Sequence, residues 1–515
     1  MHLRSIDTLR IRRWRRMTVA AAIAGLSAFS SVLTGLFSAR AVTAETHLGV
    51  CEAEVSGAIA AIINQPQFRN ARWGIRVETL GTSSTLPRLI YNQEGDRLFV
   101  PASNVKLLTT AAALDRLGAD FRIRTSVYAS NTDPNRAELR LVGRGDPSLS
   151  DDDLADLARQ VSDRGIRQVA SLDIDDRYFR SDAINPNWEW EDVQAGYGAP
   201  ATSLILNRNE IRVVAYPGRV GQPVRIEWLD DIDDSQWQIV NQTTTVASGG
   251  GFTWVGRDLS RPILYVYGQR TIGAPPDVSA ISIPNPSAYG LRQFRSALEK
   301  AGIRVLPGAI ADRATPALTS PTLPSIFDSE VASVLSPQLS NLLVDTNQSS
   351  ENVYAEALLR QVGVVGANPI PASPLRAGLD ATKDALAILG LDPNSYVLVD
   401  GAGLARQNLI SPATFVELLQ IMAQHPDAAV YRRSLAEAGI SGTLRNRFRN
   451  TAVAGRFLGK TGGLTGIASL SGYLTPLQFE PLVVSIIVSH SNQSGSTRRN
   501  AIDAIVGQLS QLRRC

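Results

Sequence analysis

The sequence predicts an α+β fold in which helices flank an antiparallel sheet and a β-rich region interrupts the chain. Groups of helices and strands near both ends support the sheet with its covering helices. Between them, from about residue 129 to 328, short strand-like segments alternate with clusters of Gly, Pro, Asn and Asp. The 515 residues, 44% of them hydrophobic, suffice for two to four domains of roughly 100–200 residues each.

The first group of elements is expected before residue 129. A helical or strand-like spacing of apolar residues identifies helices at 51–63 and 104–117 and strands at 72–79, 88–91 and 121–128. The second helix begins after Pro101 and is closed by Gly118, residues that commonly flank helices.

The second group of elements is expected after residue 328. Its helical patterns lie at 337–360, 375–389 and 498–512, and its strands at 457–460, 468–474 and 482–490. We therefore expect residues 45–128 and 329–515 to form one domain, with residues 129–328 as an inserted β-rich region.

Residues 1–44 have the character of a signal peptide. A basic segment at 10–16 precedes an uncharged, largely apolar stretch at 17–37, and small residues follow, as in a cleavage site. The alternative is an uncleaved anchor, because about 20 apolar residues can span a bilayer. We expect an exported, periplasmic protein, attached to the membrane only if this leader is retained.

The charge is concentrated in the leader. Its seven arginines against Asp7 give 7 − 1 = +6, so the formal charge of +3 leaves 3 − 6 = −3 for the remaining chain. A slightly acidic body gives no reason to expect nucleic-acid binding, which requires a concentrated basic face.

The two cysteines, Cys51 and Cys515, lie at the two ends of the expected mature chain. They are too few for a zinc ribbon and too far apart for a CxxC redox site. Two alternatives remain open: a disulfide between them, or two unrelated free thiols.

Lysine is rare in this chain, and two lysines lie in motifs that use an amine. Lys106, Lys300, Lys383 and Lys460 are the four lysines among 51 basic residues. In Ser103-Asn104-Val105-Lys106, the two ends are three residues apart on one helix face, so the amine can reach the hydroxyl. A buried amine with a lowered pKa can accept the serine proton, whereas an arginine cannot. The alternative is a surface helix.

Two further motifs contain groups that can hold a substrate. Lys460-Thr461-Gly462, followed by Gly463 and Leu464, offers a cation, a hydroxyl and an accessible backbone on an expected edge strand. Ser350-Glu351-Asn352 opens a helix. Taken alone, the first is also consistent with a glycine turn and the second with a helix N-cap.

The combination is more specific than its parts. S-x-x-K, S-x-N and K-T-G in this chain order are the signature of the penicillin-binding and class A β-lactamase superfamily. Rival chemistries lack their motifs: the four histidines have no metal-ligand spacing, and no G-x-S-x-G elbow or P-loop is present. We expect neither a metal nor another cofactor.

The sequence resembles the low-molecular-mass class C penicillin-binding proteins, the D-alanyl-D-alanine carboxypeptidase/endopeptidase family. Besides the three motifs, the resemblance rests on segments spread over nearly the whole mature chain: 101–114, 143–149, 187–192, 399–406, 441–447 and 459–474. It implies a serine β-lactamase-like transpeptidase domain, an antiparallel sheet flanked by helices with a helical subdomain. The sequence patterns alone are consistent with one or two inserted subdomains between Lys106 and Ser350, and the resemblance implies two.

The resemblance also implies roles for individual residues. Ser103 is the nucleophile, Lys106 its base, Ser350 and Asn352 complete the catalytic group, and Lys460, Thr461 and Gly462 hold the substrate. The backbone N–H groups of Ser103 and Gly463 form the oxyanion hole. Asp192, Tyr197 and Leu464 receive a diaminopimelate-type side chain. Gly463 departs from the family, which usually has Thr or Ser there, and Ala402 and Ala405 replace two customary serines.

The implied function is that of a serine D-Ala-D-Ala carboxypeptidase acting on peptidoglycan stem peptides through an acyl-enzyme and acylated by β-lactams. The balance between carboxypeptidase and endopeptidase activity is left open, as is the oligomeric state. Two competitors are a β-lactamase or esterase on the same scaffold and a non-catalytic wall-binding protein.

Overall fold

The computed structural model describes residues 49–515 except 132, 180–182, 231, 233–236 and 311–328. The expected signal peptide, residues 1–44, lies outside the described residues. Within the described part of the chain, no helix combines the length and apolar character needed to cross a membrane.

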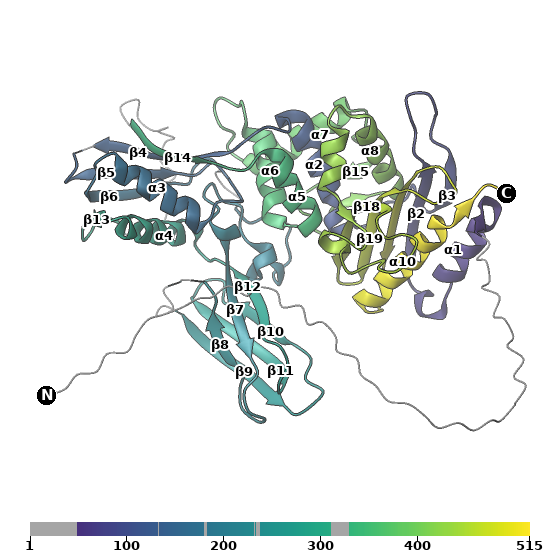
Figure 1. The fold of residues 1–515 in the computed structure, drawn as a ribbon, viewed down its shortest axis with the longest axis horizontal. Coiled ribbons are helices and arrows are strands. Elements are labelled where there is room, and N and C mark those ends of the chain that lie inside the picture. The colour runs from purple at the N-terminus through teal and green to yellow at the C-terminus, as the bar shows by residue number, and fades with distance from the viewer. Residues whose placement is uncertain (1–48, 132, 180–182, 231, 233–236, 311–328) are drawn as a thin grey trace, which may run out of the picture. The chain divides into compact units, whose positions relative to one another are not determined.

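The expected antiparallel sheet is confirmed, and it has six strands in the order β17-β18-β19-β20-β2-β3 (Figure 1). Every neighbouring pair is antiparallel. The strands are β17 (Ala436–Glu437), β18 (Phe457–Leu464), β19 (Ile467–Leu474), β20 (Leu482–Ser489), β2 (Arg72–Thr79) and β3 (Leu89–Gln93). Strands from both ends of the chain therefore meet in one sheet.

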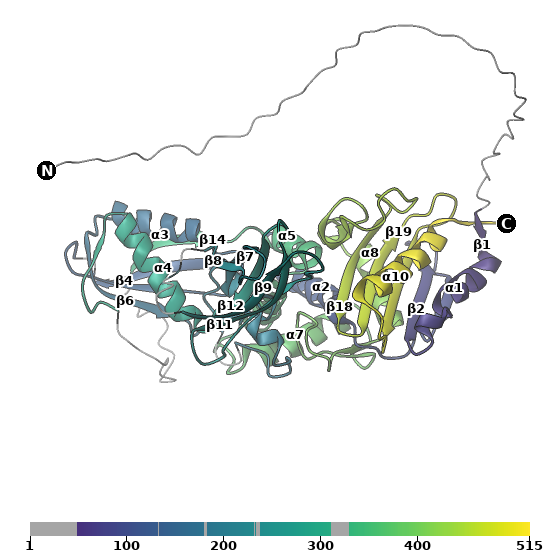
Figure 2. The same ribbon diagram turned by 90° about the horizontal axis from the view of Figure 1, so that it is seen from below.

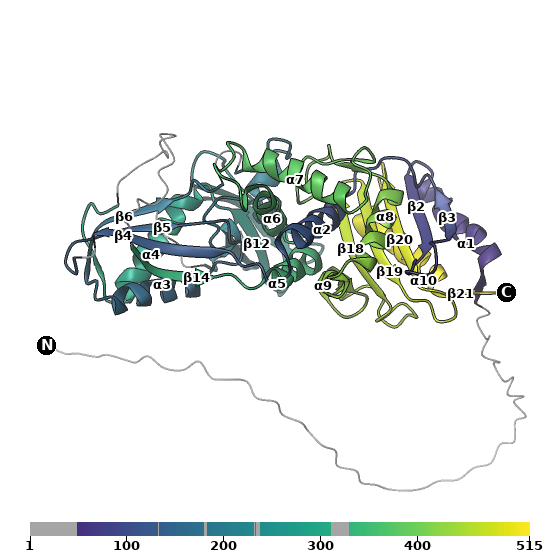
Figure 3. The ribbon, with the colours of Figure 1, turned by 90° about the horizontal axis from the view of Figure 1, so that it is seen from above.

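Helices cover both faces of this sheet. Figure 2 shows α1 (Val55–Ile63) and α10 (Gly495–Ser510) on one face, and Figure 3 shows α8 (Pro412–Gln424) on the other. Successive side chains of a strand point to opposite faces. In β20, Val484 and Ile486 accordingly pack into the core with α10, while Ile487 packs into the core with α8.

A group of helices packs beside the sheet in the same core as α8. They are α2 (Lys106–Leu117), α5 (Leu339–Val344), α6 (Asn352–Val364), α7 (Pro374–Ile388) and α9 (Ala428–Ser434). The expected helix at 337–360 is two helices, because a π-helical turn, Asp345–Ser349, separates α5 from α6. Sequence patterns did not predict α8 or α9.

The middle of the chain builds three further sheets. A five-stranded sheet has the order β13-β6-β5-β4-β14, and two three-stranded sheets have the orders β12-β7-β8 and β10-β11-β9. The strands are β4 (Arg124–Asn131), β5 (Ala137–Val142), β6 (Gln168–Asp175), β7 (Glu210–Tyr216), β8 (Arg225–Trp228), β9 (Gln238–Val246), β10 (Thr253–Arg257), β11 (Ile263–Thr271), β12 (Asp277–Ser282), β13 (Arg304–Val305) and β14 (Ser329–Leu335).

Two helices lie within this strand-rich region, α3 (Asp151–Asp163) and α4 (Pro286–Lys300), and the sequence patterns did not predict them. The Ser150 side chain accepts a hydrogen bond from the Asp153 N–H, and the Asp153 carboxylate accepts one from the Ser150 N–H. This capping box stabilises the start of α3. Both helices pack their apolar faces into the core that the sheets share.

The two ends of the described chain lie together. The short strands β1 (Val50–Cys51) and β21 (Leu512–Arg513) pair in parallel, and α1 packs against α10. Cys51 and Cys515 form a disulfide across 464 residues of sequence. Of the two alternatives that the sequence left open, the structure contains the disulfide.

Candidate active site

Ser103 lies in a tight 3₁₀ turn, Ala102–Val105, that leads into α2. The preceding Ala102 has φ of 50°, a left-handed conformation that is uncommon for a residue with a side chain. Two hydrogen bonds tie this turn to β19: Ser469 Oγ donates to the carbonyl of Pro101 at 2.7 Å, and Asn104 Nδ2 donates to Ser471 Oγ at 2.7 Å. The sheet thereby fixes the position of the half-buried Ser103 hydroxyl.

Lys106 is the first residue of α2 and is fully buried. Its Nζ donates to Ser103 Oγ at 3.0 Å, to Asn352 Oδ1 at 2.6 Å and to the Ala402 carbonyl at 2.7 Å. Burial lowers the pKa of Lys106 to about 7, against an opposing effect of the carboxylates of Asp400, Glu356 and Glu351. A neutral amine is therefore well populated near pH 7, in reach of the serine proton.

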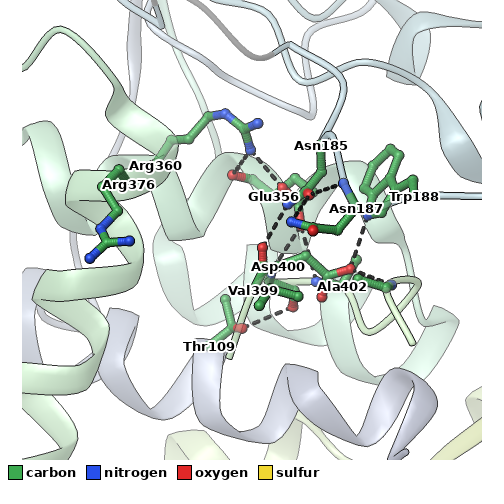
Figure 4. Close-up of polar contacts among 12 residues, drawn as sticks. Thr109, Asn185, Asn187, Trp188, Glu356, Arg360, Arg376, Val399, Asp400 and Ala402 are labelled. Carbon is green, nitrogen blue, oxygen red and sulfur yellow. Dashed lines mark hydrogen bonds and ion pairs between the residues drawn. The ribbon is translucent and has the colours of Figure 1, made fainter. Parts of the chain in front are cut away.

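Two buried carboxylates, those of Glu356 and Asp400, hold the loop that carries Ala402 (Figure 4). Glu356 of α6 accepts hydrogen bonds from the N–H groups of Gly401 at 2.7 Å and Ala402 at 3.2 Å, and it forms an ion pair with the buried Arg360 at 2.7 Å. Asp400 accepts from the N–H groups of Gly403 and Ala405, both at 2.7 Å. Together they hold the loop whose carbonyl contacts the amine.

The same loop is fixed from two further sides (Figure 4). Trp188 Nε1 donates to Asp400 Oδ2 at 2.9 Å, and Thr109 Oγ1 of α2 donates to the Gly401 carbonyl at 2.9 Å. Gly403 has φ of 84°, and a Cβ there would lie 2.1 Å from the Ala102 carbonyl oxygen. Only glycine allows the loop to approach the Ser103 turn this closely.

Ser350 follows the π-helical turn and has φ of 65°, a left-handed conformation between α5 and α6. The turn is anchored by the buried Asn347, whose Nδ2 donates to Thr110 Oγ1 at 3.1 Å and to Ser434 Oγ at 2.9 Å. Strained backbone and π-turns of this kind are concentrated at functional sites. Ser350 is not an N-cap, because the N-cap of α6 is Glu351.

Lys460 on β18 forms the opposite side of the site. It is fully buried, and its Nζ donates to Ser350 Oγ at 2.8 Å and to the Thr461 carbonyl at 2.8 Å. Burial, and secondly the charge of Lys106, hold the pKa of Lys460 well below its usual range. A bound anion would reverse this effect by favouring the charged amine.

The backbone of β18 is open beside Lys460. Within the described ranges, the outer neighbour β17 pairs only with Leu458 and Gly459, so the strand from Lys460 onward pairs on one side alone. A Cβ at Gly462 would lie 2.8 Å from the Pro101 carbonyl oxygen, whereas a Cβ at Gly463 would meet nothing within 4 Å. This part of the strand can therefore pair with an extended peptide.

Hydrogen bonds link Asn352 to Tyr197 and Tyr197 to Asp192, two further predicted residues. Asn352 Nδ2 donates to the Tyr197 carbonyl at 2.7 Å, and the Tyr197 hydroxyl donates to Asp192 Oδ1 at 3.0 Å. The other oxygen of Asp192 is buried and has no hydrogen-bond partner among the described residues, and burial raises the pKa of this carboxyl. Leu464 packs against the apolar cluster that contains Trp188 and Ala402.

The structure brings the three motifs together through the hydrogen bonds of the two lysines, and it adds residues that the motifs did not identify. Thr443 accepts a hydrogen bond from Thr461 Oγ1 at 2.9 Å, and Asn347, Glu356 and Asp400 support the two lysine-bearing sides. The sequence did contain a signal for Asp400 and Thr443, because both lie in the segments that carry the family resemblance.

Comparisons with known proteins show the family of the chain. The family model of the D-Ala-D-Ala carboxypeptidase 3 (S13) family matches residues 55–509. The D-alanyl-D-alanine carboxypeptidase of Actinomadura sp. is 33% identical over 473 residues, which cover 88% of this chain and 84% of that protein. The penicillin-sensitive carboxypeptidase A of Dictyostelium discoideum is 29% identical over 472 residues, 85% of this chain and 87% of that protein.

The fold is found in a solved structure as well. The crystal structure of penicillin binding protein 4 from Haemophilus influenzae superimposes with a TM-score of 0.72 at 22% identity. The match covers 88% of this chain and 98% of that chain.

Proposed function

The chain belongs to the D-Ala-D-Ala carboxypeptidase 3 (S13) family, and on that premise we propose that it hydrolyses D-Ala-D-Ala bonds in peptidoglycan stem peptides as a serine carboxypeptidase. The observation that carries the proposal is the contact of the Lys106 amine with Ser103 Oγ at 3.0 Å. A buried lysine with a pKa of about 7 beside a fixed hydroxyl is the arrangement that activates a serine.

The first chemical step forms the acyl-enzyme. Ser103 Oγ attacks the carbonyl carbon of the penultimate D-Ala, and its proton passes to the neutral amine of Lys106. The N–H groups of Ser103 and Gly463 stabilise the oxyanion that develops. The amide bond then breaks, and Lys106 gives up the proton that it took from Ser103, which passes through the Ser350 hydroxyl to the leaving amine and leaves Lys106 neutral again. The Ser350 hydroxyl is held by the Lys460 amine at 2.8 Å.

Water completes the reaction by attacking the ester on Ser103. Lys106 accepts a proton from this water, the ester bond breaks, and Ser103 Oγ regains a proton. Asn352 holds the amine in position for both steps, because its Oδ1 accepts from Lys106 Nζ at 2.6 Å. No oxidant or reductant takes part in this sequence.

The strand side of the site binds the substrate. Lys460 and Thr461 hold the terminal carboxylate of the peptide, and the open backbone near Gly462 pairs with its extended chain. Asp192, Tyr197 and Leu464 receive the amino end of a diaminopimelate-type side chain. If the leaving amine is free D-Ala, the enzyme acts as a carboxypeptidase; if it belongs to a cross-linked side chain, it acts as an endopeptidase.

β-Lactams acylate Ser103 because they present a reactive amide and a carboxylate to the same groups.

The leader at residues 1–44 directs the protein out of the cytoplasm, which places the site in the periplasm with its substrate.

The test compares wild type with Ser103→Ala in fluorescent penicillin labelling and in release of D-Ala from a pentapeptide. We expect a stable label and D-Ala release from wild type, and neither from Ser103→Ala. A label that wild type loses within seconds would instead indicate a β-lactamase. Absence of label and of D-Ala release from wild type would indicate a non-catalytic wall-binding protein.

A further inference from the structure

A hollow of about 520 Å³ with four aromatic side chains in its wall lies outside the residues assigned above. We call it the aromatic pocket and define it by Trp190, Trp254, Tyr265 and Tyr267. Trp190 is 67% exposed and Trp254 is 41% exposed. Large aromatic rings exposed together at one place are typical of a binding surface.

The sheet orders these rings. Trp254 of β10 lies directly opposite Tyr267 of β11 in an antiparallel pair, and their rings stack with centroids 4.9 Å apart and an angle of 16° between planes. Tyr265 is nearly parallel to Tyr267, at an angle of 18°. A Cβ on Gly256 would lie 2.1 Å from the Trp254 ring, so the indole occupies the space over this glycine. The result is a preorganised aromatic surface.

A buried cation lies in the wall of the same pocket. Arg257 is 4% exposed, and its guanidinium donates only to uncharged oxygens: Ser282 Oγ, the Val193 carbonyl and the Asp258 carbonyl. Among the described residues, no carboxylate forms an ion pair with it, and the Asp258 side chain bonds to Arg261 and Ser260 instead. The pocket therefore favours a ligand that brings acceptor oxygens.

The pocket adjoins the proposed active site. Leu259, in its wall, packs against the apolar cluster of Trp188 and Ala402, and so does Leu464 of the substrate strand. Residues 188–192 contribute side chains both to the proposed active site and to the aromatic pocket. Trp188 bonds Asp400 behind the catalytic lysine, Asp192 bonds Tyr197, and Trp190 between them lines the pocket.

We propose that the aromatic pocket binds the glycan strand of peptidoglycan, a chain of N-acetylated amino sugars. The C–H faces of sugar rings stack on flat aromatic surfaces, and the acetamido and hydroxyl oxygens accept hydrogen bonds from a group such as Arg257. Stem peptides are attached to this glycan, so a glycan subsite next to the peptide site gives one substrate two contacts. This inference rests on the proposed function.

The experiment compares two substrates of wild type, Trp254→Ala and Trp190→Ala: a free pentapeptide and the same peptide on its disaccharide. Phe252→Ala is the matched control, because Phe252 is 69% exposed in the same region and lies outside the pocket. We expect KM for the disaccharide peptide to rise about tenfold in both tryptophan variants, with KM for the free peptide unchanged. Binding of a soluble N-acetylglucosamine tetramer, followed by calorimetry, should weaken in parallel.

The inference would be overturned by equal KM values for all variants on the disaccharide peptide, by an equal rise for both substrates, or by tetramer binding that survives both tryptophan changes. A further assay measures whether the protein is retained on purified cell wall. If protease treatment of that wall abolishes the retention, the ligand is a protein, and this result would also overturn the inference. Failure of the proposed function looks different, because wild type would then bind the tetramer without hydrolysing either peptide. Thermal unfolding of each variant checks that the fold is retained.

Discussion

Two buried lysines, on opposite sides of the site, each donate a hydrogen bond to a serine hydroxyl. The charged groups around the two lysines differ, and we call the two sides the helix wall and the strand wall. The helix wall consists of α2, α6 and the loop 399–405, and it presents Lys106 with two buried carboxylates behind it. The strand wall is the part of β18 that carries Lys460. The carboxylates oppose the effect of burial on the pKa of Lys106, whereas the charge of Lys106 adds to that effect on Lys460.

From this difference in the surrounding charges, we infer different roles for the two amines. Lys106 keeps a pKa of about 7 from groups of the protein itself, so it can gain and lose a proton in every cycle. In the proposed mechanism, Lys460 receives its compensating negative charge from the carboxylate of the bound substrate. The protein therefore supplies the counter-charge on one wall, and the ligand supplies it on the other.

The most severe change to the helix wall is Lys106→Arg, which keeps the positive charge but removes the ability to lose it. We expect kcat/KM for a D-Ala-D-Ala peptide to fall by about a thousandfold, within the range of general-base contributions. Lys383→Arg, at an exposed position, is the matched control and should leave the rate unchanged. A loss of less than about tenfold would show that Lys106 is not the base.

The support of the helix wall is tested by Glu356→Gln. This change removes the carboxylate that forms an ion pair with Arg360, and both side chains are fully buried. Weakening the compensation of a buried charge costs about 3–5 kcal/mol, measured as the free energy of unfolding in denaturant.

An exposed ion pair of the same spacing provides the control for that change. Arg376 and Asp380 pair at 3.1 Å on α7, with side chains 77% and 60% exposed. Asp380→Asn should change the free energy of unfolding by about 0.5 kcal/mol or less. If the free energy of unfolding falls by a similar amount in the two variants, the buried pair stabilises the protein no more than the exposed pair does.

The strand wall is tested by Lys460→Arg, which makes its charge permanent. We expect kcat/KM to fall only about tenfold, because a cation still meets the substrate carboxylate. The base form of Lys106 is active, so wild-type kcat/KM should rise with pH through a midpoint near the pKa of about 7. A fixed positive charge nearby lowers this pKa further, so the rise should occur at lower pH in the variant. A shift to higher pH would contradict the coupling of the two lysines.

The smallest expected effect is on the strand wall, at Gly463→Ser. The site has open space for the new Cβ, and the change would add a hydroxyl to the strand that carries Lys460 and Thr461. One added hydrogen bond to the substrate carboxylate should lower KM by about three- to tenfold, with kcat unchanged. A rise in KM in steady-state kinetics would show that the space is needed by the substrate itself.

The sequence predicted the parts of the site that are local in the chain. A serine and a lysine one helical turn apart, or a K-T-G strand, leave a pattern within a few residues. The contact of Ser103 with Lys106 was expected from such a pattern, whereas Ser350 and Lys460 were identified as site residues by the combination of motifs, and their contact with each other was not predicted. Glu356 and Asn347 have no comparable pattern, because their partners Gly401 and Ser434 are brought to them only by the packed helices.

For the fold as well, elements with a clear local sequence pattern were predicted more completely than the others. Five strands of the large sheet were predicted, and the expected strand at 457–460 is longer in the structure, where β18 runs over Phe457–Leu464. The short strand β17 (Ala436–Glu437) was not predicted. Of the inserted region, the strands were expected and α3 was not, although its capping box at Ser150 and Asp153 was a readable helix signal. The expected boundary between residues 128 and 129 falls inside β4, which pairs with β14 just after residue 328. The domain boundaries themselves stay a prediction.

The bond between Cys51 and Cys515 has a consequence for the whole chain. It closes the polypeptide into a covalent ring that includes every element of the large sheet and every motif. One cut in any surface loop opens the ring without releasing a fragment, so both halves stay attached beside α1 and α10. A nicked molecule can therefore keep its lysines and serines assembled.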